Sequence, residues 1–185
     1  EPKSRAGFLR YSCEITLDPN TAHNELLLSE GNRKVTFMDQ PQSYSSHPDR
    51  FTGCAQVLSR ESLTGRCYWE VEWRERVYVA VTYKNISRAG RGNECGFGAN
   101  DKSWALNCYQ GGYKFRHNNI WTSISGPASS RVGVYLDHRA GILSFYSVSE
   151  TMTLLHRVQT TFTQPLHAGV YVWINGGSAE FFRPK

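Results

Sequence analysis

The sequence predicts an antiparallel β-sandwich with little helix. Apolar and polar residues alternate with a period of two from end to end, and no long segment carries the apolar stripe of a helix. Gly, Pro, Asn and Ser separate the alternating segments at short intervals. Parallel strands need crossover helices, which this pattern does not provide, so we expect antiparallel pairing. At 185 residues and 39% hydrophobic content, the chain is long enough for one domain with a sizeable core.

Residues 67–73 are the clearest strand, because Trp and Val occupy one parity around Glu on the other. Residues 77–83 are a second strand, rich in β-branched and aromatic side chains. Only three residues, 74–76, separate the two, so we expect a hairpin. A second hairpin is expected between 131–136 and 142–148, where a five-residue loop ends in Gly.

Shorter alternating segments complete the expected strands. They are 13–17, 25–29, 34–38, 55–59, 103–108, 113–117, 152–158, 169–174 and 178–182. Strand parity also predicts which side chains form the core between the sheets. These are Trp69, Val71, Val79, Val81, Val132, Val134, Leu143 and Phe145.

The charge distribution and the cysteine pattern of the chain argue against several classes of partner. The net charge is +5, with basic residues scattered and densest at 87–92, whereas a nucleic-acid binder concentrates its charge on one face. No apolar run approaches the roughly 20 residues that span a bilayer. The five cysteines form no Cys-x-x-Cys motif. We therefore expect no membrane or nucleic-acid partner, and free buried thiols in a reducing, cytoplasmic setting.

Motifs for catalysis are missing from the sequence. There is no Gly-x-Ser-x-Gly elbow, and the six histidines never take metal-ligand spacing. Residues 90–95 imitate a dinucleotide fingerprint but place Cys95 where the third glycine belongs, so we interpret them as a loop. Glu70 and Glu72 share one parity, and a sheet face that is solvated or salt-bridged to nearby arginines explains them better than acid–base catalysis. Those arginines are Arg66, Arg74 and Arg76. We expect no enzyme, cofactor or metal.

Groups of residues that follow one another in order along the chain resemble a known family. Residues 17–29, with Leu-Asp-Pro, Thr-Ala-His and Leu-Leu-Ser, are similar to the PRY segment, and 65–73 resemble the opening of SPRY. The later SPRY motifs match 103–106, 131–146 and 165–169, although Cys67 stands where many members carry His. The resemblance predicts PRY over 8–58 and SPRY over 59–183, merged into one compact B30.2 domain. It implies a bent two-sheet β-sandwich, or concanavalin-like jelly roll, without catalytic activity.

The resemblance also implies a function. Similar domains occur in tripartite-motif ubiquitin ligases, NOD-like receptors and stonustoxin-type toxins, and they recognise proteins. We expect a protein or peptide partner bound by loops at one end of the sandwich, in a tripartite-motif E3 ligase or an innate immune sensor. The alternative is a self-association or docking domain of a stonustoxin-like pore-forming protein. Homo-oligomers through upstream regions outside this chain are left open.

Carried over by position, the resemblance places the recognition surface after strand 77–81, around Trp104, in 109–121 and around Trp173. The expected partner-binding residues are Tyr83, Lys84, Asn85, Arg88, Trp104, Tyr109, Tyr113, Phe115, Arg116, His117, Asn119, Trp121, Tyr171, Trp173 and Asn175. Large aromatics with a polar edge carry most of the binding energy at protein interfaces. Strand parity leaves open that residues 113, 115 and 117 all face inward. Trp121 and Trp173 are the expected exposed anchors.

Overall fold

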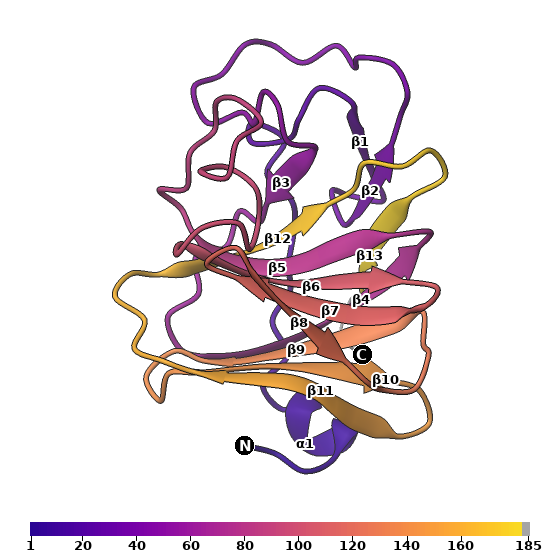
Figure 1. Cartoon of the computed structure of the whole chain (residues 1–185), viewed down its shortest axis with the longest axis vertical. Coiled ribbons are helices and arrows are strands. Elements are labelled where there is room, and N and C mark those ends of the chain that lie inside the picture. The colour runs from indigo at the N-terminus through magenta and orange to yellow at the C-terminus, as the bar shows by residue number, and fades with distance from the viewer. Residues whose placement is uncertain (183–185) are drawn as a thin grey trace.

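The structure, a computed structural model, describes residues 1–182 and consists of two antiparallel sheets with one short helix (Figure 1). The larger sheet has the order β1 (Leu26–Ser29), β2 (Lys34–Phe37), β13 (Ser178–Phe181), β4 (Arg66–Arg74), β9 (Arg131–Asp137), β10 (Ile142–Val148) and β11 (Met152–Gln159). The smaller sheet has the order β3 (Gln56–Leu58), β12 (Leu166–Tyr171), β5 (Val77–Tyr83), β6 (Ser103–Tyr109), β7 (Gly112–His117) and β8 (Ile120–Ile124). The predicted fold class is confirmed.

The core lies between the inner faces of the two sheets. All eight side chains predicted from strand parity are buried there, and the most exposed of them, Trp69, has an exposed fraction of only 3%. The ring of Phe115 on β7 approaches that of Phe145 on β10 to 6.1 Å between centroids, so side chains of the two sheets meet. The hairpin predicted between 131–136 and 142–148 is confirmed as the pair β9–β10.

The hairpin predicted across residues 74–76 is wrong. β4 pairs with β13 and β9, whereas β5 pairs with β12 and β6 in the other sheet. The three-residue link therefore turns the corner of the sandwich, and Glu75 takes a positive φ of 67° there. A short link usually joins hydrogen-bonded neighbours, but alternation along a strand does not tell which strand lies beside it.

Smaller differences concern the ends and edges of the sheets and the helix. The strand expected over 13–17 is an extended segment with isolated bridges, Ser12 to Tyr68 and Leu17 to Ser59. The edge strand β8 and the helix α1 (Arg5–Leu9) are present but were not predicted. The strand expected over 169–174 begins and ends three residues earlier, as β12.

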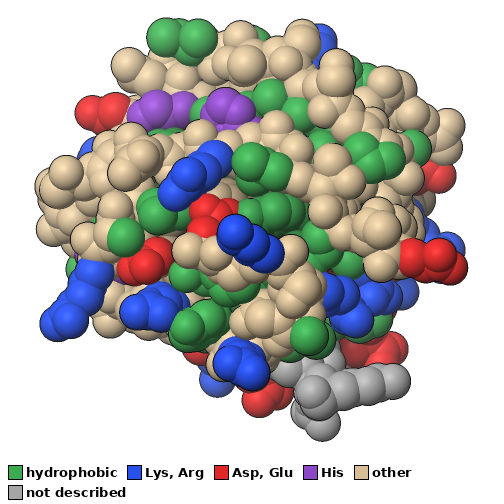
Figure 2. Space-filling view, turned by 90° about the horizontal axis from the view of Figure 1, so that it is seen from below, with side chains coloured by type: hydrophobic (Ala, Val, Ile, Leu, Met, Phe, Trp, Pro, Cys, Tyr) green, Lys and Arg blue, Asp and Glu red, His purple; other side chains and the backbone are tan. Residues whose placement is uncertain are grey.

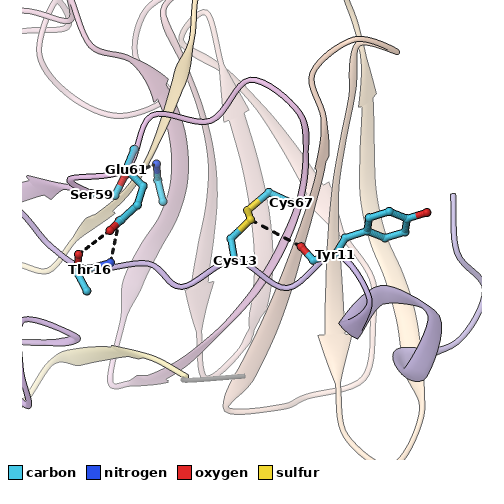
Figure 3. Close-up of a disulfide and its surroundings, with 7 residues drawn as sticks. Tyr11, Cys13, Thr16, Ser59, Glu61 and Cys67 are labelled. Carbon is cyan, nitrogen blue, oxygen red and sulfur yellow. Dashed lines mark hydrogen bonds between the residues drawn. A yellow bond between two sulfur atoms is a disulfide. The ribbon is translucent and has the colours of Figure 1, made fainter. Parts of the chain in front are cut away.

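The prediction of five reduced cysteines is wrong for two of them. Cys13 and Cys67 form a disulfide across a sequence separation of 54 residues. Figure 3 shows that this bond ties the segment after α1 to the beginning of β4. The backbone N–H of Cys13 also donates to the carbonyl of Tyr68, at 3.0 Å, which holds the two segments side by side. Cys54, Cys95 and Cys108 are free and buried, as predicted.

The helix α1 covers part of the outer face of the larger sheet, at the bottom of Figure 1. The Ser4 side chain caps it by accepting a hydrogen bond from the Gly7 N–H at 3.1 Å. Phe8 is its buried residue and packs with Tyr68, Tyr135 and Tyr146. This aromatic cluster anchors a five-residue helix that would be too short to be stable alone.

Glu70 lies beneath the same helix and is almost fully buried, with a side chain 4% exposed. Its carboxylate accepts hydrogen bonds from Arg5 at 2.8 Å and from the Tyr68 hydroxyl at 2.7 Å, and Arg131 approaches to 3.4 Å. Burial alone would raise the pKa of Glu70, but these donors outweigh it and lower the pKa. Glu70 and Glu72 are thus salt-bridged, as predicted, although the partners are Arg5 and Arg131.

Replacing Glu70 by Gln should reduce the free energy of unfolding near neutral pH by about 2 kcal/mol, because charge-assisted hydrogen bonds are lost. The folded pKa lies below the ordinary 4.5, so this stabilisation is complete above pH 4.5 and disappears as the pH falls through the folded pKa. Urea titrations of both proteins should show the difference shrinking with acid. A difference that does not change with pH would contradict the assignment, and Glu72→Gln, at a carboxylate that is 34% exposed, is the matched control.

Candidate functional site

Two rows of side chains cross the outer face of the smaller sheet, because strand register aligns them from β12 to β8. The first row is Tyr171, Tyr78, Asn107, Lys114 and Ser123, and the second is Gly169, Ala80, Ala105, Arg116 and Trp121. Residues of the opposite parity point between the sheets. The same five strands therefore build the core with one face and present a mixed aromatic and basic surface with the other.

Part of this outer face is covered by residues 84–102, which we call the covering segment. Phe97 packs on Gly169 so closely that a Cβ there would lie 2.8 Å from the phenyl ring. Ile86 and Phe97 join Phe51 and the small residues of the second row in a separate hydrophobic cluster. The covering segment leaves the other part of the sheet, toward β7 and β8, open.

Tyr78 is the centre of the aromatic contacts on the open part. Its ring centroid lies 5.0 Å from that of Trp173, 5.3 Å from Tyr171 and 6.0 Å from Trp121. These edge-on contacts are favourable for aromatic pairs. Trp121 is 42% exposed, and Tyr171 and Trp173 are partly buried. We call the surface formed by these four rings and Tyr109 the aromatic face.

Three cations border the aromatic face. The Arg116 guanidinium lies 4.6 Å from the Trp121 ring centroid, and Arg76 lies 5.5 Å from Trp173 and 5.4 Å from Tyr109. Lys114 approaches Tyr109 to 6.0 Å. Within residues 1–182, none of the three cations forms a salt bridge. Ring contacts hold each cation, and the two arginines also donate hydrogen bonds to the neutral amides of Asn107 and Asn119, which leaves the charges available to a partner.

The tyrosines of this face remain hydrogen-bond donors. Burial raises the pKa of Tyr171 to about 12. Burial also raises the pKa of Tyr78, although Arg116 and Arg76 act in the opposite direction. Both hydroxyls are protonated near neutral pH. That of Tyr78 can donate to an acceptor on a partner, whereas that of Tyr171 interacts with Cys54.

The exposed position of Trp121 depends on a two-residue turn. Asn118 and Asn119 have φ values of 51° and 63°, and His117 pairs directly with Ile120. Two consecutive residues with positive φ make a type I′ turn, which matches the twist of an antiparallel pair. The Asn-Asn dipeptide is the sequence signal from which β8 could have been found.

The structure divides the predicted binding residues into three groups. Those on the aromatic face are Tyr109, Arg116, Trp121, Tyr171 and Trp173. Those in the core, less than one tenth exposed, are Tyr83, Trp104, Tyr113 and Phe115, and partly buried His117 stacks on Trp104. Those in connections are Lys84, Asn85, Arg88, Asn119 and Asn175. Burial removes the second group from the surface, and the prediction missed Arg76, Tyr78, Asn107 and Lys114.

A cavity of about 610 Å³ lies next to the aromatic face and shares Tyr109 with it. The turn at 109–113 and the loop at 126–130 form its walls together with Trp73. Arg74 and Glu75 are its charged lining residues, and no His or Cys contributes. The lining therefore lacks a nucleophile–base constellation.

Other functional classes find no support in the part of the chain that the structure describes. No group of three metal-ligating side chains comes together in residues 1–182. The helix of the described chain is too short and too polar to cross a membrane. Lys and Arg side chains stand among acidic and neutral ones on the face seen in Figure 2, without gathering into one continuous basic patch.

Two family models cover nearly the whole chain. The SPRY-associated domain, PRY, matches residues 15–63, and the SPRY domain matches residues 66–184. The chain belongs to the PRY–SPRY family. The two segments together form a B30.2 domain, and the resemblance predicted from the sequence is confirmed. The boundary expected between 58 and 59 stays a prediction.

Individual relatives agree with this family. Stonustoxin subunit beta of Synanceia horrida is 40% identical over 169 residues, covering 89% of this chain and 24% of that protein. Tripartite motif-containing protein 16 of Mus musculus is 38% identical over 176 residues, covering 93% and 32%. The crystal structure of the TRIM65 PSpry domain has a TM-score of 0.88 at 25% identity, covering 97% of this chain and 94% of that one. This B30.2 chain thus spans a quarter to a third of the two full-length relatives.

Two tryptophan variants should separate surface from core. Trp121→Ala should change the free energy of unfolding by less than about 1 kcal/mol, because the ring is substantially exposed. Trp104→Ala should lose about 3–5 kcal/mol, because a buried ring leaves a cavity. Denaturant unfolding monitored by circular dichroism checks both values. Equal losses would mean that Trp121 contributes to the core.

Proposed function

We propose that this B30.2 domain is a non-catalytic target-recognition module that binds a protein or peptide on its aromatic face. The observation that carries the proposal is the ring cluster around Tyr78, with Trp121 exposed and three cations at its border. Tryptophan, tyrosine and arginine are the residues enriched at binding hot spots. The surface differs from the expected loop end, because it lies on the sheet with loops contributing only its margin.

The rigidity of the sandwich supports this assignment. Tyr78, Arg116 and Trp121 stand on paired strands whose opposite face is packed in the core. Side chains held in this way lose little conformational entropy when a partner binds. Membership of the family and the similarity to a tripartite-motif protein favour the substrate-recognition part of such an E3 ligase or innate immune sensor. On this proposal the domain is cytoplasmic, and any ligase activity belongs to other parts of the protein.

A second candidate function is docking or self-association within a stonustoxin-like protein. The similarity to stonustoxin subunit beta and the disulfide Cys13–Cys67 favour it, because disulfides persist in oxidising compartments. Sedimentation analysis of the isolated domain distinguishes the two candidates. A monomer that captures a different protein supports target recognition, whereas a stable self-assembly supports docking.

Truncating either tryptophan of the aromatic face, exposed Trp121 or partly buried Trp173, should weaken binding to a partner isolated by affinity capture. Trp121→Ala and Trp173→Ala should each lose at least about 2 kcal/mol of binding free energy, as hot spots do. Calorimetric titration measures the loss, and Ile120→Ala, at a neighbouring residue that is 66% exposed, is the matched control. Binding that survives the double tryptophan variant but is abolished by Glu72→Lys would place the site on the other sheet.

A further inference from the structure

We propose that the ligand of the aromatic face presents a carboxylate beside an apolar side chain, so that a short acidic–aromatic or acidic–aliphatic segment is its recognition element. This inference rests on the proposed function and adds the chemistry of the partner. Three features of the face lead to it: its hydrogen-bonding groups, its charge and the arrangement of its exposed rings.

The hydrogen-bonding groups of the face are mostly donors. Asn107 is buried, and its Oδ1 already accepts a hydrogen bond from Arg76 Nε at 3.3 Å. The guanidinium groups of Arg76 and Arg116 and the ammonium group of Lys114 carry donors only, and the protonated Tyr78 hydroxyl adds another. An incoming acceptor group therefore gains more here than another donor would.

The charge of the face favours an anionic acceptor. Arg116 lies over the Trp121 ring and Arg76 over the Trp173 ring, and both rings contact Tyr78, so each cation lies one ring away from the centre of the face. Glu75, in the turn beside Arg76, forms no salt bridge with any described cation. The planar guanidinium groups match the two oxygens of a carboxylate.

The rings require an apolar group next to that carboxylate. Trp121 and Trp173 both contact Tyr78, and each has one of the two arginines against its ring. A carboxylate bound to Arg76 or Arg116 therefore lies beside one of these rings, and its neighbouring side chain covers that ring. Burial of that side chain supplies the hydrophobic part of the binding energy.

A phage-displayed library of random peptides, panned on the wild-type domain and counter-selected on Trp121→Ala, tests the inference. Enriched peptides should carry Asp or Glu next to an aromatic or large aliphatic residue. For a synthetic peptide of this kind, replacing its acid by the matching amide should weaken binding about tenfold or more. Salt should weaken the acidic peptide more than its amide.

Charge reversal at Arg76 or Arg116 provides the matched variants. On Arg116→Glu or Arg76→Glu, the same library should yield Lys or Arg in place of the acid. Peptides that need Trp121 but show no acid preference would overturn the inference and leave the proposed function standing. If no peptide depends on Trp121 or Trp173, the proposed function fails, and the inference fails with it.

A different observation carries a second inference, which concerns two free cysteines. The sulfur atoms of Cys54 and Cys95 are 3.0 Å apart although 41 residues separate them, and both are buried. The loop before β3 and the covering segment touch here, because a Cβ on Gly53 would fall 1.9 Å from the Gly90 carbonyl oxygen. The Thr52 N–H also donates to the Arg88 carbonyl at 2.9 Å. Several backbone contacts therefore hold the thiols together.

We infer that Cys54 and Cys95 are a dithiol that hydrogen peroxide converts into a second disulfide. One thiolate attacks the peroxide, forming an S–O bond as the O–O bond breaks and water leaves. The other sulfur then displaces the second oxygen as water, so two thiols and one peroxide give one disulfide and two waters. The sulfurs need to approach by about 1 Å to reach bonding distance. The bond would fasten the covering segment to the loop before β3, near Tyr171, which lowers the pKa of the Cys54 thiol against the larger effect of burial.

Counting alkylatable thiols in the unfolded protein tests this inference. Three should react before peroxide treatment and one afterwards, with the new bond mapped by mass spectrometry to Cys54 and Cys95. Burial raises the pKa of Cys54 to about 12, so the reaction should be slow near neutral pH and faster in alkali. Cys54→Ser should abolish the loss of thiols, and Cys108→Ala should leave the new bond intact. Three reactive thiols after peroxide at alkaline pH, or a bond that involves Cys108, would overturn it.

Discussion

The pleat of the smaller sheet determines both the core and the candidate site. Successive side chains of β5 to β8 point to opposite faces, and burial of one set between the sheets fixes the register of the whole sheet. Phe115 points into the core, so its neighbour Arg116 must point to the outer face, and the same holds for Trp104 and its neighbour Ala105. Core packing therefore determines which side chains form the aromatic face, although the exposed parts of that face contribute little to the stability of the fold.

The parts of the fold predicted from sequence are those that depend on local alternation. The burial of Trp69, Val79 and Phe145 could be predicted because each strand shows its own alternation of apolar and polar residues. The prediction needs no knowledge of the neighbouring strands. The pairing of β4 and β5 with strands of different sheets, and the bond between Cys13 and Cys67, are contacts across long stretches of chain. Such contacts depend on how the two sheets stack, so they cannot be predicted from the residue pattern within one segment.

The candidate site was predicted in part for a similar reason. Resemblance to the family indicates which segments lie at the surface, and strand parity indicates which of their residues share a side. Trp104 and Tyr113 were expected on the surface because the resemblance assigns their segments to the recognition surface. Their positions in the alternation of their strands place both side chains in the core instead. Tyr78 was missed because a strand buried along its full length gives no sign of which face is partly open. The small residues Ala80 and Ala105 mark the covered part of that face, since only small side chains leave room for Phe97 and its neighbours.

The two-residue Asn118–Asn119 turn also limits how this domain can diverge. Two consecutive positive φ values suit Asn, Asp and Gly but strain β-branched residues, so substitutions at 118 and 119 stay within the first group for as long as the two-residue loop is kept. A longer loop has to restore the pairing of His117 with Ile120 before Trp121 again lies opposite Arg116 and beside Tyr78. Among descendants of this sequence, the residue types at 118 and 119 should therefore vary less than those of the longer connections.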